Sequence, residues 1–344
     1  MFERMAIVGV GAIGGVIGGY LSRSGRDLTL IDPWAANVEA MQKNGLRVTA
    51  LDEDFTTRVK AMHLGDLSTV TEPFDLIFLA VKSYDTVWAS HMLKSHLKPG
   101  GVVVSAQNSI NDDVIAPIVG YSSVIGCVIT LGAAIYEPAH VERTSAPDRP
   151  ALTVGEMSGV KSKRLDSLAE VLSDVGSTKV TANLWGERWA KLATNCMSNS
   201  VAALTGLGSA AVRQTPGVVE QYIRIGAEVV SVGTALGVDV EPINGIPAEM
   251  YNRAADGEAM EELKTRLAEG AGQLGAGRPS MAQDVFKGRR TEIEYLNGYA
   301  ARRGEEVRVA TPINRAMTHL IRQMESGDLE PAVDNIKILE PHGH

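Results

Sequence analysis

A lysine and two asparagines recur at helical spacing in the second half of the chain. Lys191, Asn195 and Asn199 stand at i, i+4 and i+8 of residues 185–205, whose apolar periodicity predicts one helix. The three side chains therefore share a face with apolar surroundings. They either form hydrogen bonds between helices or act as a functional stripe, in which the amine moves a proton and the amides hold a polar ligand. Cys196 is not favoured as a nucleophile, because no histidine lies near it in the sequence.

A glycine-rich turn near the start of the chain predicts a dinucleotide site. It follows the apolar run 5–8, opens the helical stretch 12–24, and consists of Gly9, Val10, Gly11, Ala12, Ile13 and Gly14. Gly9 permits a tight turn, Gly11 a close approach of a pyrophosphate, and Gly14 close packing of helix on strand. The helix N-terminus offers free N–H groups to the phosphates, so we predict that Gly9, Gly11, Ala12, Ile13 and Gly14 bind a cofactor. The alternative is a glycine turn without a ligand.

Asp32 follows the second predicted strand, residues 28–31. A carboxylate there accepts hydrogen bonds from the adenine ribose hydroxyls and repels a 2′-phosphate, which favours NAD(H) over NADP(H). Two alternatives stay open. Asp32 could instead cap the next helix, and the nearby Arg23 and Arg26 leave room for the phosphate of NADP(H).

Lys82 and Asn108 follow the predicted strands 76–80 and 102–105. Ligands of an open parallel sheet bind beyond the carboxyl ends of its strands, so both residues point toward a cofactor. By position alone, each is equally well explained by hydrogen bonding within its loop.

Two further polar residues stand at predicted helix starts. A helix is predicted over residues 292–303. It follows Thr291 and carries Glu292 and Glu294 in its first turn, where acidic residues are favourable. Ser280 is a plausible N-cap for the stretch that follows it. Capping explains both residues adequately without a further role.

The order of elements predicts an α/β domain followed by a helical one. Short apolar strands alternate with helices in the first half, as in a doubly wound parallel sheet. From about residue 181 long helical periodicity replaces them, so we predict domains at 1–180 and 181–344, with any shared ligand in the crevice there. The predicted strands are 5–8, 28–31, 76–80, 102–105, 124–130, 151–154 and 177–180, and the predicted helices are 12–24, 35–44, 84–93, 112–117, 185–205, 218–236, 260–274 and 292–303.

Composition excludes several classes of function. The net charge is −8, from 33 Lys and Arg against 41 Asp and Glu, which opposes binding to nucleic acid. No apolar run is long enough to span a membrane, and the start lacks a secretory signal. The two cysteines, Cys127 and Cys196, form no metal-binding motif, and His342 and His344 are too few for a metal site, so we expect no metal and a reducing cytoplasm. The glycine-rich, acidic stretch 256–278 fits a solvated helix.

These motifs, taken in order, resemble those of the ketopantoate reductase (2-dehydropantoate 2-reductase) family. The resemblance covers nearly the whole chain and rests on Gly9 to Gly15, Val81-Lys82, Gln107-Asn108, Trp189-x-Lys191-Leu-x-x-Asn195-x-x-x-Asn199, Ser280-Met-x-Gln-Asp284, Thr291-Glu-Ile-x-Tyr-Leu-Asn-Gly298 and Thr311-Pro-x-Asn314. It implies a Rossmann domain followed by a helical domain of the 6-phosphogluconate dehydrogenase type, with the active site between them, a small-molecule substrate and a homodimer.

The resemblance also implies a role for each polar residue. Lys191 becomes the general acid that protonates a carbonyl oxygen as hydride arrives from the nicotinamide, and Glu292 binds the substrate hydroxyl and helps to position Lys191. Asn195 and Asn199 bind polar groups of the substrate and Ser280 its carboxylate. Asn108 lies at the nicotinamide and the substrate, and Lys82 contacts the cofactor.

Three departures from the family pattern bear on the substrate and the cofactor. Asp32 stands where members that use NADPH commonly carry a basic residue, Ser109 replaces a frequent glycine after Asn108, which changes loop geometry near the substrate, and the stretch 241–277 is longer than the pattern requires.

We therefore expect an NAD(H)-linked oxidoreductase that interconverts a ketone and a secondary alcohol, such as a 2-oxo and a 2-hydroxy acid. A catabolic dehydrogenase and the biosynthetic 2-dehydropantoate 2-reductase both fit. A non-catalytic dinucleotide sensor and a methyltransferase, whose glycine turn is similar, are more distant alternatives.

Overall fold

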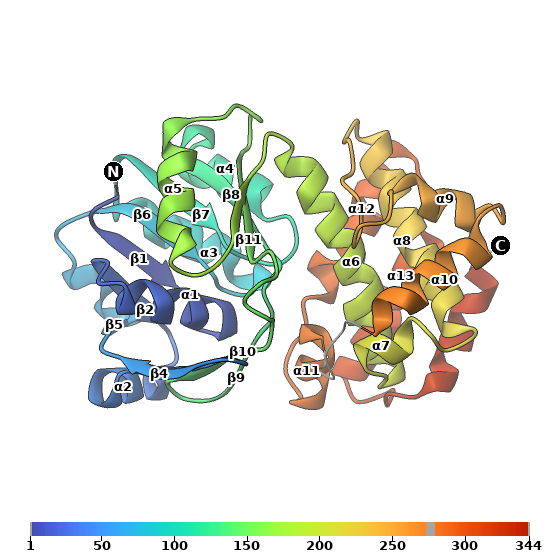
Figure 1. Cartoon of the computed structure of the whole chain (residues 1–344), viewed down its shortest axis with the longest axis horizontal. Helices are drawn as coiled ribbons and strands as arrows, with labels where there is room; N and C mark the ends of the chain where they lie inside the picture. The colour runs from blue at the N-terminus through green and yellow to red at the C-terminus, as the bar shows by residue number, and fades with distance from the viewer. Residues whose placement is uncertain (1, 273–278, 343–344) are drawn as a thin grey trace. The chain divides into compact units, whose positions relative to one another are not determined.

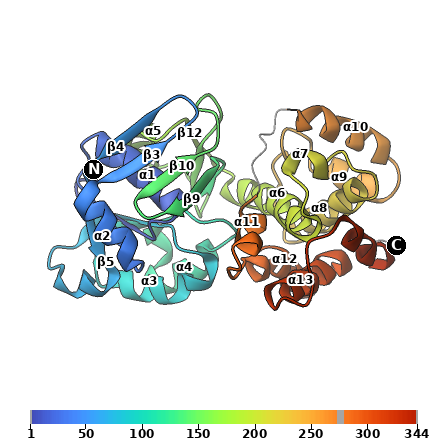
Figure 2. The same ribbon diagram turned by 90° about the horizontal axis from the view of Figure 1, so that it is seen from below.

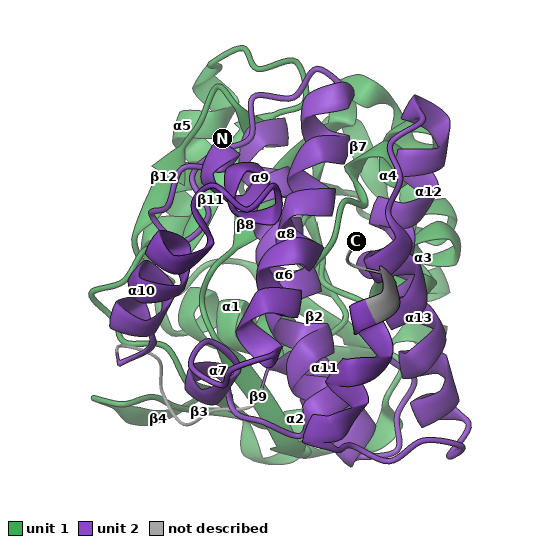
Figure 3. Ribbon diagram, turned by 90° about the vertical axis from the view of Figure 1, so that its right-hand side faces the viewer, with its two compact units in different colours: residues 1–184 green, residues 185–344 purple. Residues whose placement is uncertain are grey.

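The computed structural model describes residues 2–272 and 279–342, with side chains described as far as residue 340. The chain divides into two compact units, Met1–Leu184 and Trp185–His344, which Figure 3 shows in different colours. The end of the glycine-rich acidic stretch, residues 273–278, and the tail residues 343–344 lie outside the described part.

The first unit is built on an eight-stranded sheet in the order β12-β11-β8-β7-β6-β1-β2-β5 (Figure 1). All neighbouring strands pair in parallel except β8 and β11, which are antiparallel. The strands are β1 (Met5–Val8), β2 (Leu28–Asp32), β5 (Lys60–His63), β6 (Phe74–Leu79), β7 (Leu97–Ser105), β8 (Val124–Ile129), β11 (Leu152–Glu156) and β12 (Thr178–Val180).

Helices cover both faces of this sheet (Figure 2). Alternate residues of its strands pack against one helical layer or the other. Met5 and Ile7 of β1 pack with α1 (Ala12–Arg23) and α5 (Lys163–Ser173), whereas Ala6 and Val8 pack toward α3 (Thr86–Lys94) and α4 (Asp112–Val119). Because both faces are buried at the centre of the sheet, β1 and β8 are apolar throughout rather than alternating. Helix α2 (Ala35–Asn44) packs beside β2 and β5, and the short 3-10 helices are η1 (Leu64–Thr69), η2 (Ser83–Asp85) and η3 (Tyr121–Ser123).

A second, four-stranded sheet packs on the other side of α1. Its order is β4-β3-β10-β9, from β3 (Leu46–Thr49), β4 (Asp54–Thr57), β9 (Ala133–Glu137) and β10 (His140–Arg143). A Cβ on Gly15 or Gly19 would overlap Val141 or Val48 of this sheet, and a Cβ on Gly18 would lie 2.7 Å from Leu30 of the large sheet. Helix α1 therefore fits between two sheets because glycine occupies both of its faces.

In the described residues of the second unit the regular secondary structure is helical, apart from an isolated bridge between Ile243 and Ile246. Its long helix α6 packs closely on α8, because a Cβ on Gly226 of α8 would overlap Met197 and one on Gly233 would lie 3.0 Å from Trp189. The elements are α6 (Leu184–Thr205), α7 (Ser209–Val212), α8 (Val218–Ala235), α9 (Glu249–Ala255), α10 (Met260–Ala271), α11 (Ser280–Phe286), η4 (Ile293–Tyr295), α12 (Asn297–Val307), α13 (Pro312–Glu325) and η5 (Val333–His342).

The predicted fold class, a doubly wound sheet followed by a helical region, is confirmed, and one predicted helix is wrong. In place of a helix over 292–303, a short 3-10 turn, η4, is followed by a break at Leu296, with φ −106° and ψ −97°, and α12 starts at Asn297. The break lets the Asn297 side chain reach two neighbouring helices, a tertiary contact that helical periodicity does not report. The predicted helix over 260–274 has its last helical residue at Ala271.

Both cysteines are buried and unbridged. Among the described residues, no helix is long and apolar enough to cross a bilayer, and no cluster of His, Cys, Asp and Glu side chains could hold a metal ion.

We expect Gly14→Ala to destabilise the first unit by about 2–3 kcal/mol, because its Cβ would overlap the Gly9 carbonyl oxygen, a backbone atom that cannot move aside. Gly11→Ala is the matched control, since no atom lies within 4 Å of a Cβ there, and it should cost less than about 1 kcal/mol. Urea unfolding of both variants measures the difference. Equal midpoints would refute the packing explanation.

Candidate functional site

Four neighbouring strands of the large sheet bring the predicted cofactor residues to one edge. The strands β7, β6, β1 and β2 are adjacent and parallel, so their carboxyl ends meet. Asn108, Lys82 and the glycine turn follow the ends of β7, β6 and β1, and Asp32 is the last residue of β2. This is the edge of an open parallel sheet where ligands bind.

The glycine turn has the shape that a diphosphate requires. Gly9 has φ +93°, and a Cβ there would lie 2.7 Å from the Val81 backbone nitrogen, so only glycine fits. Over Gly11, in contrast, no atom lies within 4 Å of the Cβ position. Helix α1 begins at Ala12 without a side-chain cap, so its first N–H groups, including those of Ile13 and Gly14, have no acceptor within the helix. The turn therefore offers both space and donors to a dinucleotide.

The Asp32 side chain is tied to the glycine turn. Its Oδ2 accepts a hydrogen bond from the Val10 N–H at 2.5 Å, and its Oδ1 accepts one from the Trp34 N–H at 2.7 Å. Burial raises the pKa of the Asp32 carboxyl, and these two hydrogen bonds oppose the rise. Helix α2 has Trp34 at its N-cap, so the bond from the Trp34 N–H ties Asp32 to the start of that helix as well as to the glycine turn. Asp32 holds the turn against the end of β2.

Both arginines that could receive a 2′-phosphate are engaged elsewhere. Arg23 forms an ion pair with Glu53 at 2.5 Å, and its guanidinium lies 3.8 Å from the centre of the Phe55 ring. Arg26 pairs with Asp174 at 2.9 Å. A 2′-phosphate would have to compete with these carboxylates.

The loops that carry Lys82 and Asn108 are joined by the side-chain amides of Gln107 and Asn111, for which the sequence predicted no role. Gln107 Nε2 donates to the Val81 carbonyl at 2.9 Å, and Asn111 Nδ2 donates to the Asn108 carbonyl at 2.8 Å and to Ser83 Oγ at 3.1 Å. The position of Gln107 and Asn111 shortly after β7 was the sequence signal that could have indicated this role.

Ser109 has φ +70°, the left-handed conformation that glycine adopts readily. The backbone at this position therefore has the conformation that glycine favours, and the side chain of serine makes that conformation strained.

The predicted stripe on α6 is largely buried. Asn195 is 4% exposed, Asn199 is 7% exposed, and Lys191 is half-buried. Burial alone lowers the pKa of the Lys191 amine to about 8. Within the part of the chain that the structure describes, no carboxylate pairs with this amine and no hydrogen bond reaches it. An amine in this state can give up and take back a proton near neutral pH.

The structure joins Asn199 directly to Ser280. Asn199 Nδ2 donates to Ser280 Oγ at 3.3 Å. The prediction that Ser280 caps the following helix is wrong, because Pro279 occupies the N-cap, Ser280 is the first residue of α11, and no side-chain cap bond forms. Since Pro279 fixes where α11 begins, the serine hydroxyl is directed to α6 instead.

Glu292 is buried, with 5% of its surface exposed, and lies at the N-cap of η4 without a side-chain cap bond. The predicted first-turn role for this carboxylate is therefore wrong. The segment is anchored by Thr291, whose N–H donates to Glu325 Oε1 of α13 at 2.6 Å.

Cys196 lies between Asn195 and Asn199 on α6 and is fully buried. Burial raises the pKa of its thiol well above the usual value, and Glu228 raises it further. Thiolate chemistry is therefore disfavoured, in agreement with the prediction that Cys196 is not a nucleophile.

Comparison with known proteins identifies related chains over nearly the whole length. The model described as "Ketopantoate reductase PanE/ApbA" matches residues 5–159, and its C-terminal counterpart matches residues 183–325. The 2-dehydropantoate 2-reductase of Pyrococcus horikoshii is 30% identical over 325 residues, which is 94% of this chain and 98% of that protein.

Two solved structures show the same fold. A PanE/ApbA family ketopantoate reductase from Ralstonia eutropha JMP134 superposes with a TM-score of 0.78 at 28% identity, covering 94% of this chain and 99% of that one. A D-mandelate dehydrogenase bound to NADH and anilino(oxo)acetate superposes with a TM-score of 0.80 at 22% identity, covering 94% and 99%. With the two matched models and the relative from Pyrococcus, these structures lead to one conclusion: the chain belongs to the ketopantoate reductase family.

Proposed function

We propose that the protein is a nicotinamide-dependent oxidoreductase that interconverts a ketone and a secondary alcohol, namely a 2-oxo acid and the corresponding 2-hydroxy acid. The observation that carries this proposal is the Lys191 amine, held on an apolar helix with a pKa of about 8. A structural lysine normally keeps its amine in water or pairs it with a carboxylate. Proton transfer at neutral pH requires the opposite arrangement.

Each unit has its own task in this proposal. The first unit binds the dinucleotide through Gly9, Gly11 and the α1 N-terminus, with Lys82 and Asn108 on the adjoining loops. The second unit binds the substrate through the amides of Asn195 and Asn199, the Ser280 hydroxyl and the Glu292 carboxylate. The bound nicotinamide supplies the hydride in reduction and accepts it in oxidation.

Lys191 balances the charge of the reaction. In reduction the substrate carbonyl oxygen gains negative charge, and the Lys191 ammonium stabilises that oxygen and gives it a proton. The neutral amine left on Lys191 is favoured by the same burial that lowers its pKa. In oxidation the neutral amine takes the proton from the alcohol, so one residue serves both directions.

We further propose that NAD(H) is preferred over NADP(H). The Asp32 carboxylate lies at the end of β2, where its charge opposes a 2′-phosphate. Arg23 and Arg26 support this preference because both already have carboxylate partners.

The second candidate function is the biosynthetic reduction of 2-dehydropantoate. It is favoured by the full-length similarity to proteins that carry this name, such as the one from Pyrococcus horikoshii. Rates on 2-dehydropantoate and on other 2-oxo acids, each with NADH and with NADPH, separate the two candidates.

We also propose a homodimer in a reducing cytoplasm, where two buried thiols without a bridge are expected.

Replacing Lys191 tests the proposed function. We expect Lys191→Met to lower turnover by about 10²–10⁴-fold and to leave NADH affinity unchanged, because the variant loses the proton donor and keeps the first unit intact. Steady-state kinetics and a fluorescence titration of NADH measure both effects. Lys264→Met is the matched control, because Lys264 of α10 pairs with the carboxylates of Glu220 and Glu261. The turnover of this variant should stay within about twofold of that of the unchanged enzyme. Full activity in the Lys191 variant would refute the proposal.

The same variant has an effect on stability with a defined sign. The Lys191 pKa falls from 10.5 to about 8 on folding, so the protonated amine destabilises the folded protein at pH values below 8. Lys191→Met should therefore raise the free energy of unfolding by at most about 3 kcal/mol at pH 7, and the gain should shrink between pH 8 and 10.5 as the folded amine deprotonates. Chemical unfolding at several pH values measures this gain, and a gain that does not change with pH would contradict the assigned pKa.

The direction of catalysis should depend on pH through the same amine. Reduction needs the protonated form, so its kcat should fall as pH rises through about 8, whereas kcat for oxidation should rise over that range. Initial rates in both directions at saturating substrate between pH 6 and 10 test this expectation. Parallel profiles for the two directions would exclude Lys191 as the titrating group.

Replacing Asp32 tests the cofactor preference. We expect Asp32→Asn to weaken NADH binding by about tenfold and to change NADPH binding less, because the charge that selects the ribose hydroxyls is lost. Asp27→Asn removes one carboxylate charge from a surface pair with Lys60 and serves as the control. Tighter binding of NADPH than of NADH to the unchanged protein would overturn the preference.

A further inference from the structure

The family motifs contain two asparagines, Asn297 and Asn314, that the proposed reaction leaves without a task. Both are fully buried in the second unit. Asn297 begins α12, five residues after Glu292, and Asn314 lies in the first turn of α13. A buried amide is costly unless its groups are paired, so their contacts indicate what they do.

Asn297 joins two helices through the hydrogens of its amide. Its Nδ2 donates to the Cys196 carbonyl of α6 at 3.3 Å and to Asn314 Oδ1 of α13 at 2.9 Å. The Cys196 carbonyl lies within the turn of α6 that carries Asn195 and Asn199. The amide therefore fastens the substrate-binding turn to the start of α12.

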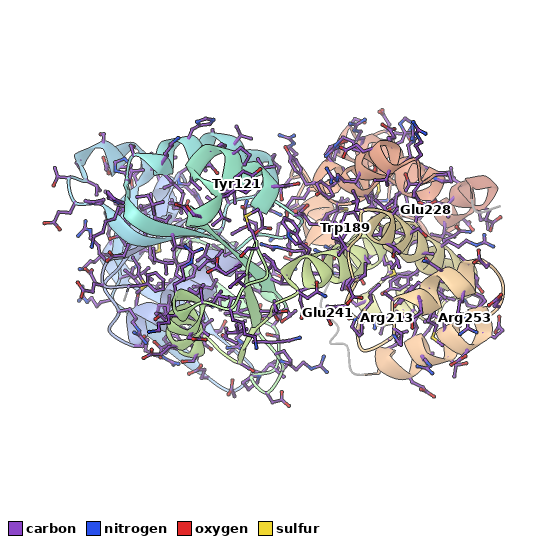
Figure 4. All side chains as sticks on the ribbon, turned by 90° about the horizontal axis from the view of Figure 1, so that it is seen from above. Tyr121, Trp189, Arg213, Glu228, Glu241 and Arg253 are labelled. Atoms are coloured by element: carbon purple, nitrogen blue, oxygen red, sulfur yellow. The ribbon has the colours of Figure 1, made fainter. Side chains whose placement is uncertain are left out.

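Glu228, which is labelled in Figure 4, fixes the other end of this chain of contacts. Its carboxylate on α8 accepts hydrogen bonds from the Ile313 and Asn314 N–H groups, both at 2.9 Å, and from Asn314 Nδ2 at 2.7 Å. A carboxylate at a helix N-terminus is favourable, and here it also holds the Asn314 side chain in place. Because Asn314 Nδ2 is used in this way, Asn314 Oδ1 is left to accept from Asn297.

Asn297 keeps this orientation at the expense of its own carbonyl. Asn297 Oδ1 is buried and has no hydrogen-bond partner among the described residues. Rotating the amide would place this oxygen against two other acceptors, the Cys196 carbonyl and Asn314 Oδ1. An unsatisfied buried acceptor costs about 1–3 kcal/mol. An unpaired oxygen is therefore the cost at which the amide hydrogens of Asn297 are kept on α6 and α13.

We propose that Asn297 is a positioning residue: its amide holds the turn of α6 that carries Asn195 and Asn199 in register with the buried segment that carries Glu292. The inference rests on the proposed function, in which these side chains bind one substrate. A small displacement between binding groups is enough to change a reaction rate by about 100-fold.

The experiment compares two asparagines that are fastened to the same helix. Asn297→Leu removes the bonds to the Cys196 carbonyl and to Asn314 Oδ1. Asn335→Leu is the matched control, because Asn335 Nδ2 donates to the Leu204 carbonyl at 3.2 Å, at the far end of α6 from Lys191. We expect Asn297→Leu to lower kcat by about tenfold or more, and Asn335→Leu by less than about twofold. Both should bind NADH with unchanged affinity, since neither alters the first unit.

A second readout distinguishes positioning from general loss of structure. If the turn of α6 loosens and water reaches Lys191, its pKa should return toward 10.5, so the alkaline limb of kcat for reduction should move above pH 8 in Asn297→Leu only. If Asn297→Leu does not fold, Asn297→Ser, which keeps one donor, is measured in the same way. A folded Asn297 variant whose kcat and pH profile match those of Asn335→Leu overturns the inference. Loss of turnover in Lys191→Met alongside that result would leave the proposed function in place, so the two failures are distinguishable.

Discussion

An ammonium group on an apolar helix face, without a carboxylate to neutralise it among the described residues, is the constraint on which the second unit depends. Burying such a charge opposes folding, so the surrounding helices must supply the stability that Lys191 removes. They do so by close packing. Gly226 and Gly233 let α8 lie against α6 at Met197 and Trp189, where any larger side chain would hold the helices apart.

In the first unit the corresponding constraint is the space around α1. Glycine on two faces lets the helix contact the large sheet at Leu30 and the small sheet at Val48. The same close contact fixes the N-terminal turn of the helix, where no side chain caps the free N–H groups. Packing thus fixes the position of these free N–H groups, and Asp32 completes the turn through the Val10 N–H.

The sequence predicted local features well and tertiary contacts poorly. The strand over residues 5–8 and the helix over 35–44 have the predicted bounds, because apolar runs and helical periodicity are local signals. The small sheet was missed, although Gly15 and Gly19 marked a helix face that something must approach closely. The break at Leu296 and the bond from Asn199 to Ser280 were missed for a different reason. Both depend on which helices become neighbours, and no spacing along the chain encodes that.

Two of the local costs in the structure lie beside residues with proposed chemical roles, one in each unit. Ser109 adopts a left-handed backbone directly after Asn108, and Asn297 leaves its carbonyl oxygen unpaired while it holds the turn between Asn195 and Asn199. Each cost is of the order of 1–2 kcal/mol, a sizeable fraction of the stability of a folded domain. A sequence under selection for stability alone would replace Ser109 with glycine. Such costs also occur at residues without a proposed role, as at Ala139 with φ +56° and at the buried Tyr251 hydroxyl, so Ser109 and Asn297 are connected to the proposed chemistry by their contacts: Ser109 by its place next to Asn108, and Asn297 by its bond to α6.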